Sequence, residues 1–281
     1  MDSHKKIIAG IHSLEPLPAV CTRVMQLAGN ETVVPTELVS VIQSDVAITA
    51  KVLRICNSAY YGFARQVTSL DEAGNRLGVN TLVNLVLTAC SGSYFKSFGK
   101  TSQARAKELR ERSVSNALSA SLLAGIQGDI DKNAAYTVGL LQDIGEVVLE
   151  RFLPAEAKEI QLQLSNGLSQ TEVEANLLGE DHAHIGARLA EQWDFPDSLV
   201  DAIRFHHAPS SASVAPGLAC AANIADSITM AMAHGGQGDG GSVVEITDEI
   251  LKLVGLEAIG SQSLESQIHA ELERARELIG G

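Results

Sequence analysis

The sequence is poor in aromatic residues, which make up 4% of the chain although hydrophobic residues make up 45%. It also lacks convincing period-two alternation and any strand–helix–strand pattern. Both absences argue against β-sandwiches, barrels and parallel α/β folds. Ala, Leu, Ser and Glu are abundant, and apolar residues recur at helical spacing, which is typical of closely packed helices. The sequence therefore predicts an all-α protein built from two packed helical subdomains.

Positive charge is scarce as well. The 34 acidic residues outnumber the 21 basic ones, and the net charge of the 281 residues is −13 with neutral histidines. Such a surface repels nucleic acid and anionic membranes, so neither is expected as a partner. The basic residues between Arg105 and Arg112 alternate with acids, which is typical of a solvated helix face.

Cysteine motifs and long apolar runs are missing. The four cysteines form no CxxC pair, and each stands among small or apolar residues, which predicts buried free thiols in a reduced compartment. No run has the length of a membrane span or the form of a secretory signal, so we expect a soluble, cytoplasmic protein. The glycine-rich segment 235–241 lacks the preceding strand and the Lys-Ser/Thr of a phosphate-binding loop, and it is predicted to be a flexible loop.

Helices are predicted along almost the whole chain from caps, apolar spacing and Gly or Pro stops. The predicted N-caps include Asp45, Asp131 and Asp181, and capping boxes start at Ser69 and Ser169. Charge rises between residues 99 and 112, which places a subdomain boundary inside a continuous helix over 102–126. The predicted subdomains are 1–105 and 106–281. The expected helices cover 5–12, 19–27, 46–57, 70–77, 80–95, 102–126, 132–152, 154–165, 170–178, 182–193, 196–207, 218–234, 247–254 and 263–279, with another starting at Pro35.

The loop 58–63 holds three of the few aromatic residues: Tyr60, Tyr61 and Phe63. Exposed aromatic rings can form a platform for a ligand. They can equally close the ends of neighbouring helices as a hydrophobic plug, and we favour this second interpretation.

One apolar stretch, residues 138–146, carries an aspartate in its middle and glycines near both ends. A buried carboxylate such as Asp143 is costly unless a cation, a metal or several donors neutralise it. A metal in a helical core needs His and carboxylate ligands from several helices. Each candidate also has a simpler explanation, such as a local cap, a solvated acid or a cation at a helix C-terminus. The candidate partners of Asp143 are Arg112, His182, His184, His206, His207 and Asp226.

Several motifs together resemble the HDOD domain, a helical signalling branch of the HD phosphohydrolase superfamily. Residues 42–61 resemble the family's Asp-Pro-x-Leu-Thr-x-x-Leu-Leu-x-x-Asn-Ser pattern, and residues 69–78 resemble its next segment. Gly-Leu-Leu-Gln-Asp-Ile-Gly at 139–145 stands where relatives have Gly-Leu-Leu-His-Asp-Ile-Gly. The segments around residues 181–186, 193–196, 203–207 and 225–226 follow in family order. The resemblance covers nearly the whole chain and implies an HD-like C-terminal subdomain.

The departures from the catalytic HD pattern concern the metal ligands. The His of the His-Asp pair is Gln142, and Arg112 stands in the neighbourhood of the expected early histidine. A glutamine amide is a poor ligand for a transition metal. A guanidinium cannot be a ligand at all, because it does not deprotonate. We expect Arg112 to replace the metal electrostatically by binding Asp143 bidentately, and Asp226 with it. This hypothesis predicts no stoichiometric metal. Any ion that did bind would take its ligands from Asp143, His182, His206, His207 and Asp226.

Two classes of function follow from the resemblance. The first, which we favour, is a non-catalytic module of bacterial signal transduction that acts through protein contacts. Its expected partner is a response regulator, a diguanylate cyclase or a kinase, as in two-component or second-messenger circuits, and no cofactor is expected. The alternative is a metal-dependent phosphohydrolase of nucleotides or cyclic dinucleotides with a rearranged site, in which the metal activates water. A module that binds a nucleotide without cleaving it lies between them. The sequence leaves the oligomeric state open.

Overall fold

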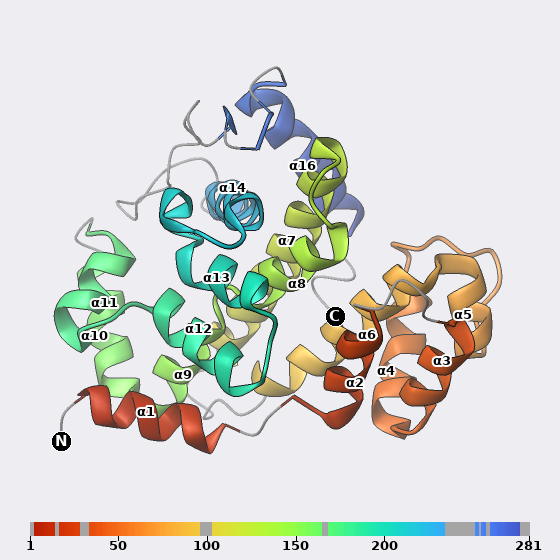
Figure 1. Cartoon of the computed structure of the whole chain (residues 1–281), viewed down its shortest axis with the longest axis horizontal. Coiled ribbons are helices and arrows are strands. Elements are labelled where there is room, and N and C mark those ends of the chain that lie inside the picture. Colours follow the sequence, from red (N-terminus) through yellow and green to blue (C-terminus); the bar gives the residue numbers. More distant parts are fainter. Residues whose placement is uncertain are drawn as a thin grey trace. The chain divides into compact units, whose positions relative to one another are not determined.

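The described residues form helices joined by turns and loops, with no strand among them, which confirms the all-α fold class. The structure is a computed structural model, and it describes residues 3–14, 17–28, 34–95, 103–164, 168–233, 251–252, 254–256 and 259–275 (Figure 1). The chain divides into two compact units, one formed by 1–15 and 95–272 and the other by 16–94 and 273–281. The division into subdomains 1–105 and 106–281, which was made from the sequence, remains a prediction.

Five helices that follow one another in the chain make up most of the described part of the smaller unit. The predicted cap Asp45 is confirmed, because its carboxylate accepts two backbone N–H groups at 2.9 and 3.0 Å. Ser69 Oγ accepts the backbone N–H of Glu72 at 3.1 Å, while the Glu72 carboxylate reaches back to the backbone N–H of Thr68. The helices are α2 (Ala19–Ala28), α3 (Pro35–Gln43), α4 (Val46–Cys56), α5 (Leu70–Leu77) and α6 (Val79–Phe95).

A disulfide within the smaller unit corrects one prediction. Cys21 on α2 is bonded to Cys90 on α6, and their Cα atoms lie 6.7 Å apart. The expectation of four free thiols is therefore wrong for this pair, since two cysteines 69 positions apart meet only when α2 and α6 pack together. Cys56 and Cys220 are buried free thiols, as predicted.

The aromatic loop of the smaller unit is ordered by ring contacts. The rings of Tyr61 and Phe63 are stacked with centroids 6.4 Å apart, and the Arg76 guanidinium lies 5.1 Å from the Phe63 centroid. All three aromatic side chains of the loop are partly exposed. A fully buried plug does not describe this loop.

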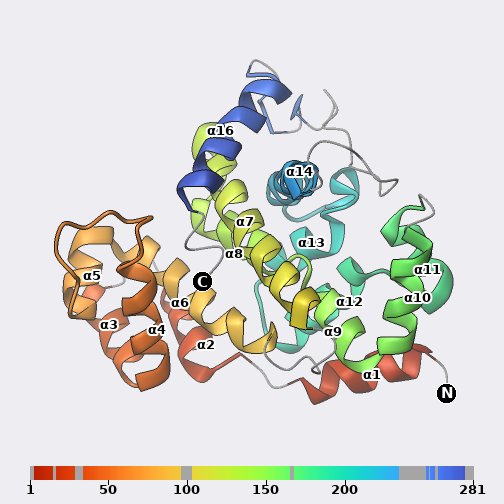
Figure 2. The same ribbon diagram turned by 180° about the vertical axis from the view of Figure 1, so that it is seen from behind.

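The larger unit is organised around the long helix α7, which packs against α8 and α14 (Figures 1 and 2). The pairs α12 with α13 and α10 with α11 pack beside this centre, and α1 contacts α9 and α12. The core is aliphatic and dominated by Ala, Leu, Ile and Val. The helices are α1 (Ser3–Ser13), α7 (Gln103–Gln127), α8 (Lys132–Leu141), α9 (Ile144–Phe152), α10 (Pro154–Leu164), α11 (Gln170–Leu178), α12 (His182–Gln192), α13 (Asp197–Phe205), α14 (Pro216–Ala233) and α16 (Ser261–Arg274).

The single helix predicted over 132–152 is interrupted at Gln142 and Asp143, which is a correction. The backbone of Asp143 has φ −96° and ψ 12°, so α8 ends and α9 begins around it. Two glycines permit the close packing on either side. A Cβ on Gly139 would lie 2.5 Å from the carbonyl oxygen of Asn116, and one on Gly145 would lie 2.0 Å from that of His182. Helical periodicity cannot reveal this break, because tertiary contacts cause it.

Three further local predictions have mixed outcomes. Asp131 and Asp181 cap α8 and α12 as expected. The second capping box is wrong: the Ser169 side chain makes no cap hydrogen bond, and its hydroxyl is hydrogen-bonded with that of Thr171 at 3.0 Å. The loop after α13 contains a short 3-10 helix, η2 (Pro209–Ser211). The predicted loop 235–241 and most of the predicted helix 247–254 lie outside the described residues.

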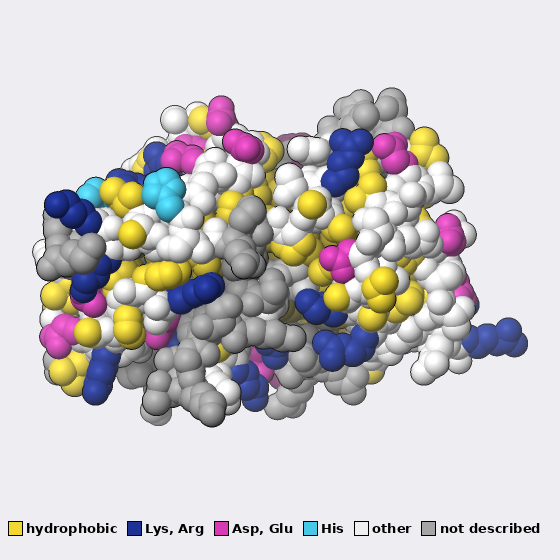
Figure 3. All heavy atoms as spheres, turned by 90° about the horizontal axis from the view of Figure 1, so that it is seen from below, with side chains coloured by type: hydrophobic (Ala, Val, Ile, Leu, Met, Phe, Trp, Pro, Cys, Tyr) yellow, Lys and Arg dark blue, Asp and Glu magenta, His cyan; other side chains and the backbone are white. Residues whose placement is uncertain are grey.

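None of the described helices has the length and apolar character needed to cross a membrane. On the face drawn in Figure 3, Lys and Arg side chains are scattered in small groups among apolar and acidic ones, without gathering into one patch.

Candidate functional site

Asp143 lies at the junction of α8 and α9 and is 5% exposed. Arg112, from α7, donates from Nε to Asp143 Oδ2 at 2.9 Å. The predicted pairing of these two residues is confirmed. The predicted bidentate contact is wrong, because Arg112 Nη2 donates to Glu146 Oε1 instead. One guanidinium therefore neutralises two carboxylates that stand one helical turn apart.

Arg105, two turns earlier on α7, extends this ion-pair network. Its Nη2 donates to Glu146 Oε2, and its Nε lies 3.6 Å from Glu150 Oε1. The Arg105 side chain is only 17% exposed. A solvated helix face, as predicted from the alternating charges, is therefore wrong for Arg105 and for Arg112, whose side chain is 10% exposed.

The network keeps its acids ionised. Burial alone would raise the pKa of Asp143, but the Arg112 guanidinium and the nearby His206 hold it well below the usual range. The pKa of Glu146 is lowered in the same way, since Arg112 and Arg105 outweigh the effect of its burial. These carboxylates raise the pKa of Arg112 well above its ordinary value, although burial opposes them. The cluster is a set of fixed charges near neutral pH.

Asn116, on α7, connects Asp143 to the late aspartate of the predicted site. Its Nδ2 donates to Asp226 Oδ1 at 2.9 Å and lies 3.4 Å from Asp143 Oδ2. Thr229 Oγ1 donates to Asn116 Oδ1, which fixes the orientation of the amide. Burial, followed by the charge of Asp143, raises the pKa of Asp226. Asp226 thus belongs to the site through an amide and not, as predicted, through Arg112.

His182 opens α12 and faces Asp143. Its Nδ1 is 2.7 Å from Glu174 Oε2, which also accepts the backbone N–H of His182 at 2.7 Å. Its Nε2 is 3.6 Å from Asp143 Oδ1. Both His182 and Glu174 are buried. The Glu174 carboxylate thereby sets the ring orientation of His182.

His206 and His207 follow the end of α13. His206 is fully buried; its Nδ1 is 2.8 Å from the carbonyl oxygen of Ile203, and its Nε2 is 3.6 Å from Asp143 Oδ1. His207 Nε2 is 3.0 Å from His182 Nε2. The His206 Nε2 atom has no hydrogen-bond partner among the described residues. His182 Nε2 and His206 Nε2 therefore both face Asp143 Oδ1, while His207 joins the group through His182.

The protonation of these rings follows from their partners. Burial alone would lower the pKa of His182, but the Glu174 carboxylate raises it to about 10. Burial lowers the pKa of His207 well below its usual value, and the neighbouring His206 and His182 lower it further. His182 is thus a cation at neutral pH that donates from Nε2 to the neutral His207.

Gln142, which stands in the position of the expected histidine, is fully buried. Neither atom of its amide has a hydrogen-bond partner among the described residues. Two groups of His, Asp and Glu side chains nearby could hold a metal ion: His182 with His206 and His207, and Asp143 with Glu146 and His182. Within each group the ligand atoms lie within 4.8 Å of one another.

The structure brings together most of the predicted site. Arg112, Asp143, His182, His206 and His207 are in direct contact or within 3.6 Å of a neighbour in the set, and Asp226 joins through Asn116. His184 does not belong to the site; it is 46% exposed and paired with Asp181. The sequence interpretation missed the second layer of the site. These residues are Arg105, Asn116, Glu146, Glu174 and Thr229.

Only Glu146 and Glu174 carried a usable signal. Each is an acid beside buried aliphatic residues of its helix, as Asp143 is. Asn116 and Thr229 are ordinary polar residues within helices, and no local pattern marks them as partners 113 positions apart.

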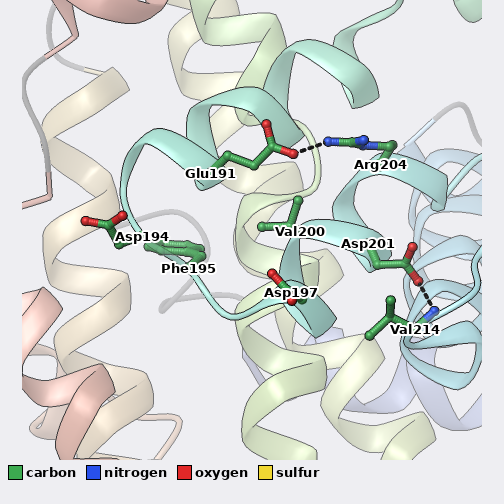
Figure 4. A pocket seen from close by; sticks show the side chains of 8 residues that line it. All are labelled: Glu191, Asp194, Phe195, Asp197, Val200, Asp201, Arg204 and Val214. Atoms are coloured by element: carbon green, nitrogen blue, oxygen red, sulfur yellow. Dashed lines mark hydrogen bonds and ion pairs between the residues drawn. The ribbon is translucent and has the colours of Figure 1, made fainter.

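Apart from the cluster around Asp143, an open hollow of about 410 Å³ lies between the end of α12, α13 and the segment before α14 (Figure 4). Two of the four acids that line it are engaged in the protein itself: Glu191 pairs with Arg204, and Asp201 accepts the backbone N–H groups of Val214 and Ala215. The remaining lining contains the buried Phe195 and Val200. These contacts hold α12, α13 and the start of α14 together, so we assign a structural role to the residues that line the hollow.

Comparison with known proteins identifies the family. The family model of the HDOD domain matches residues 14–209, and the chain belongs to this family. A curated relative from Treponema pallidum, an uncharacterised protein, is 30% identical over 199 residues. The match covers 70% of this chain but 38% of that relative, so the chain spans well under half of the relative's length.

Solved structures have the same fold. An HDOD domain protein of unknown function from Geobacter sulfurreducens has a TM-score of 0.80 at 23% identity, over 99% of this chain and 95% of that one. A candidate phosphohydrolase from Shewanella amazonensis has a TM-score of 0.74 at 25% identity, over 98% and 97%. A candidate signal transduction protein from Marinobacter aquaeolei has a TM-score of 0.79 at 22% identity, over 99% of this chain and 65% of that one. These likenesses show that the chain shares its fold with all three proteins.

Proposed function

We propose that this chain is a non-catalytic module of bacterial signal transduction that acts through protein contacts. The observation that carries the proposal is the Arg112 guanidinium bound to Asp143 Oδ2 and to Glu146. A hydrolytic metal would need those oxygens, and a permanent cation already takes them. Gln142 supports the same conclusion, because it supplies an amide where a catalytic site needs an imidazole.

The proposed partner is a response regulator, a diguanylate cyclase or a kinase of the same cell. The family's signalling branch supports this class of partner. Pairwise two-hybrid assays against these proteins from the same genome test it: specific pairing with one of them is expected. If every partner class fails to pair while folded protein is present, the proposal of protein contacts is wrong.

The alternative is a metal-dependent phosphohydrolase, and one observation favours it. His182 and His206 both face Asp143 Oδ1, and the three histidines form a group of possible ligands whose atoms lie within 4.8 Å of one another. Hydrolysis additionally needs an open coordination position for water. The second group of possible ligands includes Glu146, whose carboxylate already accepts from Arg112 and Arg105, which counts against turnover.

Hydrolysis of a nitrophenyl phosphodiester and of cyclic dinucleotides, with Mn²⁺, Fe²⁺ and Zn²⁺ supplied in turn, distinguishes the two functions. We expect no metal-dependent turnover above the buffer rate. Metal-dependent turnover by the wild type that is lost in Asp143→Asn would establish the phosphohydrolase instead. The folded Lys107→Ala variant, changed at an exposed position of α7, is the matched control.

A further inference from the structure

The loop between α4 and α5 (Figure 1) holds three of the chain's aromatic residues, which number one Trp, four Tyr and six Phe in all. Their rings form a continuous row. Tyr60 and Tyr61 meet edge to face with centroids 4.8 Å apart, and Phe63 is stacked on Tyr61. The Arg76 guanidinium lies over Phe63 and ends the row. Each ring is partly exposed, so a binding partner can reach the row from solvent.

The side chain of Asn57 holds this loop closed. Its Nδ2 donates to the carbonyl oxygen of Val67 at 2.9 Å, and the backbone N–H of Val67 donates to Asn57 Oδ1 at 2.7 Å. Between these two residues the chain turns at Gly62, whose φ is +60°. A loop that is fixed before binding loses little conformational entropy when a partner binds, which favours affinity.

The charge around the loop differs from that of the rest of the chain. No acidic residue stands between Asp45 and Asp71, although the net charge of the whole chain is −13. Arg54, on the last turn of α4, and Arg65, in the loop, are both exposed. The next acid, Glu72, pairs with Arg76 at 2.7 Å. The rings therefore lie in the part of an acidic chain where positive charge prevails.

We propose that residues 57–67, together with Arg54 and Arg76, form the surface on which the chain binds an acidic segment of its protein partner. Tyr, Phe and Arg are the residue types enriched at the centre of protein interfaces. The rings contact apolar side chains of the segment, and the guanidinium groups pair with its carboxylates. This inference rests on the proposed signalling function and names the part of the chain that makes the protein contact.

Aromatic rings beside arginines also suit single-stranded nucleic acid, on which bases stack. The net charge of −13 repels an extended polyanion, which would have to pass over more of the chain than this loop. A short acidic protein segment meets only the local positive charge. The charge distribution therefore favours a protein partner.

A defined peptide tests the surface on the full chain. A short fluorescein-labelled peptide of Glu and Leu is titrated with the protein, and fluorescence anisotropy reports binding. A Lys and Leu peptide of equal length and a labelled oligothymidylate serve as the other probes. We expect saturable binding of the Glu and Leu peptide alone, weakened by added salt. Absence of saturation with this peptide, or tighter binding of the oligothymidylate, would overturn the proposal.

Charge reversal locates the binding surface. Arg54→Glu/Arg65→Glu should weaken peptide binding by about 10-fold or more, because both side chains would repel its carboxylates. Lys107→Glu/Lys158→Glu makes the same change of net charge at exposed positions of the larger unit and should bind like the wild type. Equal weakening by the two double variants would show that only net charge matters, which contradicts the proposal.

A ring variant tests the aromatic part. Tyr61→Ala removes the ring that contacts both of the others and should weaken peptide binding by about 10-fold. Unchanged affinity in the folded variant would exclude the rings from the surface. If Tyr61→Ala does not fold, the charge-reversed variant decides, since both of its positions are exposed.

Pairwise two-hybrid assays separate this proposal from the signalling function. A signalling protein that pairs with the wild type should no longer pair with Arg54→Glu/Arg65→Glu. Pairing retained by that folded variant overturns the surface and leaves the signalling function intact. If no signalling protein pairs with the wild type, the signalling function fails, and the peptide titration still decides whether the loop binds acidic segments.

Discussion

Arg112 Nε lies 2.9 Å from Asp143 Oδ2, and Nη2 of the same guanidinium donates to Glu146 Oε1. The long helix α7 thereby fixes the α8–α9 junction by charge as well as by packing. Because all three side chains are at most 10% exposed, solvent does little to screen these contacts.

Removal of the guanidinium should destabilise the larger unit. Arg112→Ala leaves the buried Asp143 without its guanidinium partner and Glu146 with Arg105 alone, which should lower the free energy of unfolding by about 3–5 kcal/mol. Lys107→Ala, on the same helix but with a 66% exposed side chain, should change it by less than about 1 kcal/mol. Urea unfolding of both variants gives the comparison, and equal small losses would show that the ion pairs are not important for stability.

The amide between the two aspartates should be hard to replace. Asn116→Ala removes the donor shared by Asp143 and Asp226 and leaves the Thr229 hydroxyl with the Asp226 carbonyl oxygen alone as acceptor. We expect a loss of about 2–3 kcal/mol, since buried polar groups lose their partners. Asn176→Ala, at an exposed position of α11, is the matched control. A thermal melt of Asn116→Ala that coincides with the wild type would refute this assignment.

Gly145 should tolerate no side chain. Its Cβ would be placed 2.0 Å from the His182 carbonyl oxygen, so Gly145→Ala has to push α9 and α12 apart. Overpacking of this kind costs about 1–3 kcal/mol or more. Gly92→Ala in α6 meets no atom within 4 Å and gains helix propensity, so it should be neutral or stabilising. Denaturation midpoints measured side by side are decisive, and a neutral Gly145→Ala would disprove the close approach.

Reduction should weaken the smaller unit. The Cys21–Cys90 bond closes a loop with a sequence separation of 69, and its loss should lower the free energy of unfolding by about 4 kcal/mol in the chain-entropy description. A reducing agent should therefore lower the melting temperature of the wild type. The same agent should have no effect on the double variant Cys21→Ser/Cys90→Ser. Unreacted thiols at Cys21 and Cys90 under oxidising conditions would show that the bond does not form.

Helix caps could be predicted from the sequence where the capping side chain and the N–H groups it binds are close together in the chain. Asp45, Asp131 and Asp181 cap their helices because a carboxylate can reach N–H groups two or three residues ahead. Ser169 fails as a cap, since its hydroxyl is bonded with Thr171 instead. The break between α8 and α9 was missed because the helical spacing of apolar residues continues across it, although the backbone leaves the helical conformation there.

The sequence by itself determined the helical class, most helix positions, the family and the identity of the residues around Asp143. Composition, periodicity and motif order are properties of neighbouring residues and can be read directly. Only the tertiary structure decided that Arg112 divides its contacts between Asp143 and Glu146, that Asn116 joins Asp143 to Asp226, and that two imidazoles face one oxygen of Asp143. Those relationships depend on the packing of α7, α8, α12 and α14 and on the end of α13. Contacts between residues that are 30 to 110 positions apart cannot be recognised from the local sequence pattern.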